Sequence, residues 1–259
     1  MAGRLRGRLG WVLLALGAYL VFLVAGVPAA AAWQWLGGDP VLRRAVQLQG
    51  LAGTVWDGEA AAARVRGMDL GRVEWELRLL PLAWGELAAR VAFRRDDGSG
   101  RGEVGRGLGG ALRLREAELR LPAQALMPLL YGYPVVPQGE AVARLKRLEV
   151  APGERFTAEG RIVWRGAGFA APRPMDLGDL VVTLAPDGEG GTRGTLADAG
   201  GPLSVEGVLT IGADGTWQLK ATLAARESGS PVAGALRFLG RPDARGRVTL
   251  VRRGRLPLR

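Results

Sequence analysis

Few residues in this sequence have the types needed for chemistry. The chain contains neither cysteine nor histidine. It therefore has no thiolate nucleophile, no Ser-His-Asp triad, no imidazole or thiolate metal ligand, and no usual general base for neutral pH. Most common enzyme designs are excluded, so we expect no enzymatic activity, no bound metal and no cofactor.

One motif suggests a phosphate site. Gly105, Gly107 and Gly110 form the pattern G-x-G-x-x-G, which binds dinucleotides when it follows a strand and opens a helix. Here the alternating residues 112–115 come directly after it and predict a strand. We therefore interpret the glycine-rich insert 98–110 as a flexible hairpin loop.

Two pairs of aspartates have the donor type of a cation site or of an acid-base pair. These are Asp96 with Asp97, and Asp176 with Asp179. Aspartates in such positions commonly form solvated turns, and we favour that interpretation.

Charge is the next feature, because the formal net charge is +10. The arginines alternate with apolar residues and lie close to acids, as in residues 72–78, which predicts a solvated sheet face. We therefore expect no nucleic-acid partner. The basic C-terminus leaves two interpretations open, contact with anionic lipid or an acidic partner, and an edge strand whose charges block aggregation.

The N-terminus predicts a membrane anchor. Arg4, Arg6 and Arg8 precede a run without charge from Leu9 to Ala32, which as a helix is roughly 36 Å long and can cross a bilayer. The charges place residues 1–8 in the cytoplasm, 9–36 in the bacterial inner membrane as a single span, and the rest in the periplasm. A signal peptide cleaved near Ala31 is the alternative, but the run exceeds the usual apolar region of about 7 to 15 residues.

Beyond the anchor, apolar and polar residues alternate with a period of two, which predicts strands. In the clearest case Phe156, Ile162 and Trp164 face the apolar side while Arg161 and Arg165 face water. Turn signals at Asp97-Gly98, Asp187-Gly188 and Asp214-Gly215 predict hairpins. Further strands are expected at 72–79, 203–211 and 216–223, and short helices at 40–48, 122–130 and 231–239, the last ended by Gly240.

The fold class is therefore mainly β, with a single transmembrane helix followed by a periplasmic domain of antiparallel, twisted β-meanders and a few short helices. The proline-rich stretch 128–137 is the expected boundary between two β units. These units comprise residues 37–130 and 131–259.

Several blocks, in the same order along nearly the whole chain, resemble the type II secretion system protein N family (general secretion pathway protein N). The first block is G-L-A-G-T-V-W-D-G at 50–58, and the second is W-E-L-R-L-L-P-L-A-W-G-E-L at 75–87. The others are G-R-I-V-W at 160–164, L-A-D-A-G-G-P-L at 196–203 and L-G-R-P-D-A-R-G-R at 239–247. The chain departs from the family pattern at Asp57 and in the insert 98–110.

The resemblance implies a non-catalytic component of the machine that moves folded proteins from the periplasm across the outer membrane. It implies other secretion components of the inner membrane and periplasm as partners, together with inner membrane lipid. It also marks family-motif residues with structural or interaction roles: Gly53, Thr54, Trp56, Gly58, Trp75, Pro81, Gly160, Trp164, Gly200, Gly201, Pro202, Gly240, Asp243 and Gly246. Of these, we interpret Gly53, Trp56 and Gly58 first as structural residues of a strand with an aromatic plug.

A second functional hypothesis remains open. The one-sided strands could curl into an anchored groove that binds or conveys lipid or another apolar ligand, instead of enclosing a filled core.

Overall fold

The computed structural model describes Tyr19 and residues 26–36, 44–78, 81, 84–129, 136–151, 153–171 and 174–256. The predicted cytoplasmic N-terminus lies outside these residues, as does most of the predicted membrane anchor. None of the helices in the described ranges combines the length and apolar character needed to cross a membrane.

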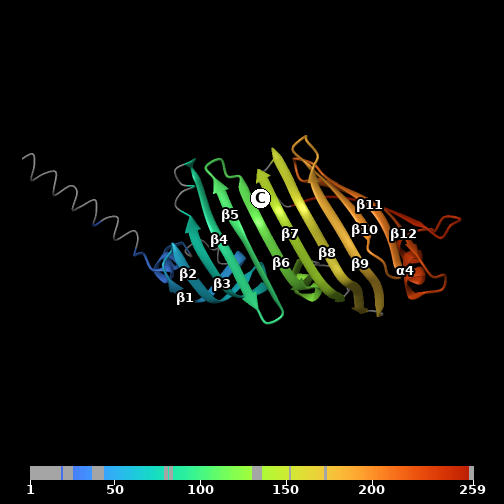
Figure 1. The fold of residues 1–259 in the computed structure, drawn as a ribbon, viewed down its shortest axis with the longest axis horizontal. Helices are drawn as coiled ribbons and strands as arrows, with labels where there is room; N and C mark the ends of the chain where they lie inside the picture. The colour runs from blue at the N-terminus through green and yellow to red at the C-terminus, as the bar shows by residue number, and fades with distance from the viewer. Residues whose placement is uncertain are drawn as a thin grey trace, which may run out of the picture.

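The described chain is dominated by one antiparallel sheet of 13 strands, arranged in the order of the sequence. Figure 1 shows the sheet running from the N-terminal strands to the C-terminal strands as a single twisted layer. The expected mainly β class and antiparallel meander are confirmed. The strands are β1 (Val46–Gly53), β2 (Asp57–Val65), β3 (Met68–Arg78), β4 (Glu86–Arg95), β5 (Gly98–Gly107), β6 (Leu112–Pro122), β7 (Val136–Ala151), β8 (Arg155–Ala171), β9 (Met175–Pro186), β10 (Thr192–Asp198), β11 (Leu203–Ile211), β12 (Thr216–Ala225) and β13 (Val248–Arg255).

Short helices within the described ranges include α2 (Ala29–Leu36), η2 (Ala123–Leu129) and α4 (Pro231–Leu239). The second and third match the expected helices, although η2 is a 3-10 helix, and the Gly240 N–H donates to the Leu236 carbonyl as a C-cap. The helix expected at 40–48 is wrong at its C-terminal end, because Val46 and Leu48 belong to β1 and pair with Val65 and Ala63. Strand pairing satisfies the backbone there and overrides the local helix signal.

The glycine-rich insert is not a loop. Residues 98–107 form β5, which pairs with β4 on one side and β6 on the other. Only the tight turn at 108–111 interrupts the ladder. The expectation of a flexible hairpin loop is therefore wrong, because glycines that look flexible in sequence are held by neighbouring strands on both sides.

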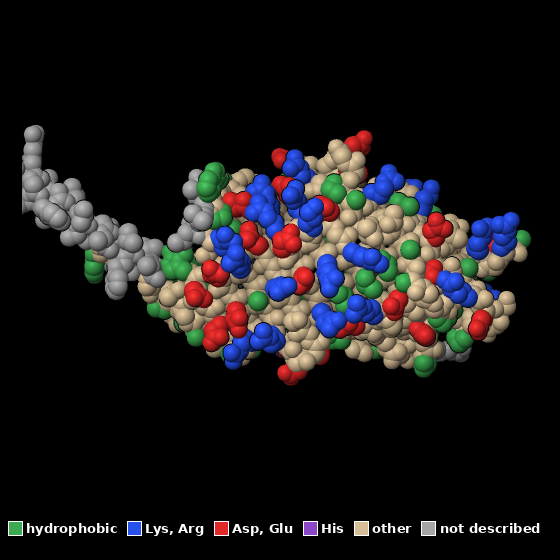
Figure 2. Space-filling view, in the orientation of Figure 1, with side chains coloured by type: hydrophobic (Ala, Val, Ile, Leu, Met, Phe, Trp, Pro, Cys, Tyr) green, Lys and Arg blue, Asp and Glu red, His purple; other side chains and the backbone are tan. Residues whose placement is uncertain are grey.

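Register separates the side chains onto two faces, since paired residues of adjacent strands share a face. Trp75 pairs with Val91, and Ile162 pairs with Val182, which pairs with Leu196. We call this side the apolar face. The opposite side, the charged face, carries Arg72, Glu74, Glu76, Arg90, Arg101, Glu103, Arg113, Arg115, Arg144, Arg147 and Glu149. Figure 2 shows acidic and basic side chains interspersed over β4 to β8 on this face.

The apolar face is closed over at its C-terminal end. There Val232 and Leu236 of α4 pack with Leu203, Val205, Ala221, Leu223 and Val248 into one buried cluster. Nearer the N-terminus, η2 contacts β3, β6 and β7. Leu87, Val104 and Leu112 stay 41–50% exposed on the same face, so this face is only partly covered.

The predicted domain boundary coincides with the connection between β6 and β7. These two strands pair from Leu112 with Val150 to Pro122 with Glu140, so the sheet passes through this point without a break in pairing. The division into two β units stays a prediction.

Candidate functional site

The first family motif forms the turn between β1 and β2. The Thr54 hydroxyl oxygen accepts hydrogen bonds from the backbone N–H groups of Trp56 and Asp57, at 3.2 and 3.1 Å. The Trp75 indole N–H donates to the Val55 carbonyl at 3.1 Å, and the Leu77 N–H donates to the Trp56 carbonyl at 2.6 Å. Two aromatic residues and a hydroxyl thus fix this turn against β3.

Both glycines of this motif are required by close packing. A Cβ at Gly53 would lie 2.6 Å from the Asp57 carbonyl oxygen, at a φ of +77° that disfavours other residues. A Cβ at Gly58 would lie 2.7 Å from the Trp75 ring. The half-buried Trp75 ring therefore packs against Gly58, and the role of Trp56 as the aromatic plug stays a prediction.

The turn also holds the chain that precedes α2. Val55 N–H donates to the Val27 carbonyl at 3.1 Å, and Pro28 bridges to Thr54. The C-terminal part of the predicted anchor is therefore attached to the sheet at the β1–β2 turn.

The motif G-R-I-V-W at 160–164 lies where the pairing of β7 with β8 is interrupted by bulges. Gly160 approaches β7 so closely that a Cβ would lie 2.7 Å from the Leu145 Cα. The Trp164 indole N–H donates to the Gln138 carbonyl at 2.7 Å, and its ring meets Phe169 edge to face at 5.9 Å. Trp164 packs on the C-terminal cluster while Arg161 and Arg165 are exposed, which confirms their predicted faces.

The glycines and proline of the block at 196–203, Gly200-Gly201-Pro202, connect β10 to β11. A Cβ at Gly201 would lie 2.5 Å from the Gly178 Cα. Asp198 organises this turn by accepting from Val205 N–H at 2.9 Å and from Gly200 N–H at 3.2 Å, and by pairing with Arg226. The Val205 N–H, helped by Gly200 and Arg226, lowers the pKa of the Asp198 carboxyl against the opposing effect of burial.

The block at 239–247 links α4 to β13. Asp243 accepts from the backbone N–H groups of Arg245 and Arg247, at 2.8 and 2.9 Å, and from the Arg247 side chain. These hydrogen bonds, led by that from the Arg247 N–H, lower the pKa of the Asp243 carboxyl. Gly246 completes the turn at a φ of +73°. The remaining predicted residue, Pro81, lies half-buried between β3 and β4.

The predicted site residues therefore do not converge on one pocket. They occupy separate turns, bulges and a helix end, where most of them stabilise the local connection between strands. The paired aspartates behave in the same way, since Asp176 accepts from Gly178 N–H and Asp179 accepts from Gly166 N–H. Among the described residues, no group of acids is arranged to hold a metal ion.

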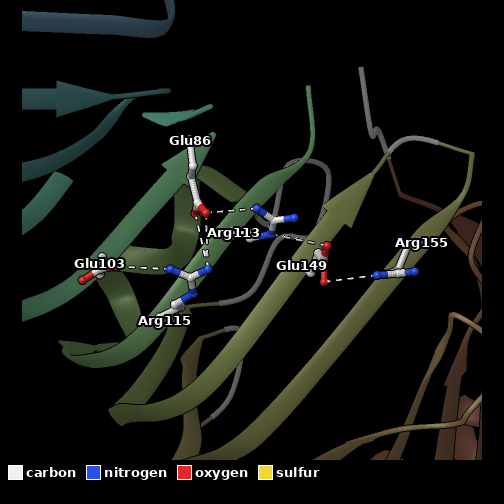
Figure 3. Close-up of polar contacts among 6 residues, drawn as sticks. All are labelled: Glu86, Glu103, Arg113, Arg115, Glu149 and Arg155. Atoms are coloured by element: carbon white, nitrogen blue, oxygen red, sulfur yellow. Dashed lines mark hydrogen bonds and ion pairs between the residues drawn. The ribbon is translucent and has the colours of Figure 1, made fainter. Parts of the chain in front are cut away.

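Sequence reasoning missed the main polar feature, a ladder of ion pairs across the charged face (Figure 3). It joins β3 to β8 through contacts of 3.1 to 3.5 Å. Its members, in order of contact, are Arg78, Glu103, Arg115, Glu86, Arg113, Glu149 and Arg155. The three acids are 14–23% exposed, so water screens these pairs less than it screens ordinary surface pairs.

The glycine-rich strand makes room for this ladder. A Cβ at Gly105 would overlap the Glu86 carboxylate, and one at Gly100 would overlap the Phe93 ring on the other face. Glu86 Oε1 is buried without a hydrogen bond and lies 3.4 Å from Arg115. Of the three glycines in the G-x-G-x-x-G motif, Gly105 thus makes room for a side chain of the adjacent strand, and the register of β4 against β5 is the signal that the motif alone does not contain.

Comparison with known proteins gives a consistent result. The family model described as "Type II secretion system (T2SS), protein N" matches residues 44–251. The "Type II secretion system protein N" of Vibrio cholerae serotype O1 is 30% identical over 230 residues, covering 83% of this chain and 87% of that protein. The proteins of the same name from Aeromonas hydrophila and Klebsiella pneumoniae are 29% and 27% identical, covering 92% and 94% of this chain and 95% and 94% of their own lengths.

No solved structure gives a significant match. The matched region begins just before β1 and reaches into β13, so it includes all the family-motif residues described above. This chain belongs to the type II secretion system protein N family.

Proposed function

We propose that this protein is a non-catalytic, single-pass component of the type II secretion machinery in the bacterial inner membrane. Its N-terminus is cytoplasmic, and its periplasmic sheet is a scaffold that aids export of folded periplasmic proteins across the outer membrane. The observation that carries this proposal is the family match over residues 44–251.

The geometry supports a scaffold in two ways. The motif residues stabilise the shape of the sheet, as Thr54 and Trp75 do at one turn and Asp243 does at another. The two sheet faces differ sharply in chemistry, so each offers its own surface to partners in the inner membrane and periplasm. We expect no cofactor and no nucleic acid among these partners.

A deletion strain tests the proposal. Loss of the protein should retain folded exoproteins in the periplasm and deplete them from the medium, and the wild-type gene should restore their release. Crosslinking in the native membrane should capture other secretion components. Normal secretion in the deletion strain, with no secretion component crosslinked, would refute the proposal.

A second candidate function is the binding or conveying of lipid or another apolar ligand along the sheet. It is favoured by the continuous apolar face, on which Leu87, Val104 and Leu112 remain 41–50% exposed. Mass spectrometry of the purified protein tests this candidate. Co-purified lipid that is lost in Val104→Glu would support it, whereas equal lipid content in both proteins would count against it.

A further inference from the structure

An exposed apolar patch lies at one end of the strands near the predicted anchor. Trp84, Leu87, Leu108 and Leu112 are 81%, 50%, 93% and 50% exposed. We call these four residues, together with Arg106, the rim patch. Exposing this much apolar surface in one place is unfavourable unless something covers it.

Strand pairing and one loop contact bring the rim patch together. Leu87 pairs with Arg106, and Arg106 pairs with Leu112, so these three share the apolar face. Leu108 N–H donates to the Gly85 carbonyl at 3.1 Å, which places it beside the neighbour of Trp84.

The position of the rim patch identifies what covers it. Leu77 pairs with Ala89, near the start of β4, and its backbone N–H donates to the Trp56 carbonyl in the β1–β2 turn. The start of β4, at Glu86, therefore lies at the same end of the sheet as this turn. That turn holds Val27 and Pro28, which lie in the C-terminal part of the predicted membrane anchor. Two to four strand spacings separate the turn from β4, β5 and β6, about 10 to 20 Å, so the patch is close to the C-terminal end of the predicted anchor.

The chemistry of the rim patch suits a bilayer interface. Tryptophan prefers the headgroup level because its ring is large and apolar while its N–H is polar. Arg106 is exposed, and no ion pair to an acid is found for it among the described residues, so its charge is free for anionic headgroups. Glu86 pairs across the sheet with Gly107, the neighbour of Arg106, but lies on the opposite face, where it forms ion pairs with Arg113 and Arg115.

We propose that the rim patch rests on the inner membrane, with Trp84 and Leu108 inserted at the headgroup level, so that the sheet stands in a fixed orientation beside its own anchor. This inference rests on the membrane anchor of the proposed function. It adds a second, lateral contact between the sheet and the lipid surface.

The test uses the full chain in vesicles of phosphatidylethanolamine and phosphatidylglycerol. Because the sequence has no cysteine, Leu108→Cys and Val208→Cys each accept one environment-sensitive fluorophore. Val208 is the matched control, since it is an exposed apolar residue at 38% on the charged face of β11. We expect the label at 108 to shift to the blue and to be quenched by lipids with shallow spin labels, as an insertion of about 5 to 10 Å requires.

Two further variants make the result specific. Trp84→Ser and Arg106→Glu should each reduce quenching at position 108 and leave the unfolding midpoint unchanged, because both side chains are exposed. Equal behaviour of the labels at 108 and 208 would overturn the proposal. The proposal would also be overturned if the label at position 108 were shielded from water in native membranes but not in vesicles that contain this protein alone. That result would assign the patch to a protein partner. Secretion assays report separately on the proposed function.

Discussion

Replacing Trp164 with alanine should destabilise the sheet at the bulged joint of β7 and β8. A fully buried tryptophan costs about 3 to 5 kcal/mol when truncated, and Trp164 is only partly buried, which reduces its packing term to about 2 kcal/mol. Loss of the edge-to-face contact with Phe169 at 5.9 Å adds about 0.5 to 1 kcal/mol. Loss of the hydrogen bond to the Gln138 carbonyl adds about 1 kcal/mol, so we expect a total of about 3.5 to 4 kcal/mol.

Urea unfolding of the full chain in detergent, followed by circular dichroism, measures this loss. Trp164→Phe keeps much of the ring packing but lacks the N–H donor, and should cost about 1 to 1.5 kcal/mol. Arg165→Ala is the matched control on the opposite face, where the side chain is 52% exposed and lies 3.8 Å from Glu140. It should cost less than about 0.5 kcal/mol. Equal destabilisation by Trp164→Ala and Arg165→Ala would refute the assignment of the Trp164 ring to a stabilising contact on the apolar face.

Three further substitutions test other parts of the sheet by the same unfolding measurement. Gly105→Ala should cost about 1 to 3 kcal/mol because its Cβ displaces Glu86 from the ion-pair ladder, whereas Gly109→Ala, with no atom within 4 Å, should change stability by less than about 0.5 kcal/mol. Asp198 has a lowered pKa in the folded state, so its carboxylate stabilises the fold above the unfolded pKa of about 3.9, and this contribution is lost as the pH falls through the lower folded value. Asp198→Asn should reduce the loss of stability at acid pH, and an unchanged dependence of stability on pH would exclude Asp198 as a cause of that loss. Ser230→Ala removes the cap that accepts from Ala233 N–H at 3.3 Å and should cost about 1 kcal/mol, while Ser228→Ala in the same exposed turn serves as its control.

The strand class, most turns and the family follow from local features of the amino-acid sequence. Period-two alternation along a strand is a local property, so Phe156, Ile162 and Trp164 were assigned to the correct face without any partner strand. Turn residues act locally too, which explains why the hairpins at Asp97-Gly98 and Asp214-Gly215 were found. The C-cap at Gly240 follows from the same kind of local signal.

The register of the strands, and therefore the contacts of the glycines and charged residues, follows from the folded sheet and not from local sequence. Gly105 looks like part of a phosphate loop until β4 places the Glu86 carboxylate across it. The local sequence predicts a helix that includes Val46 and Leu48, but both residues belong to β1 because β2 supplies hydrogen-bond partners. The ion-pair ladder joins Glu86 to arginines 27 and 29 positions away, and such contacts depend on the register of several strands at once. Local spacing carries no information about that register, because it is fixed by pairing and burial across the whole sheet.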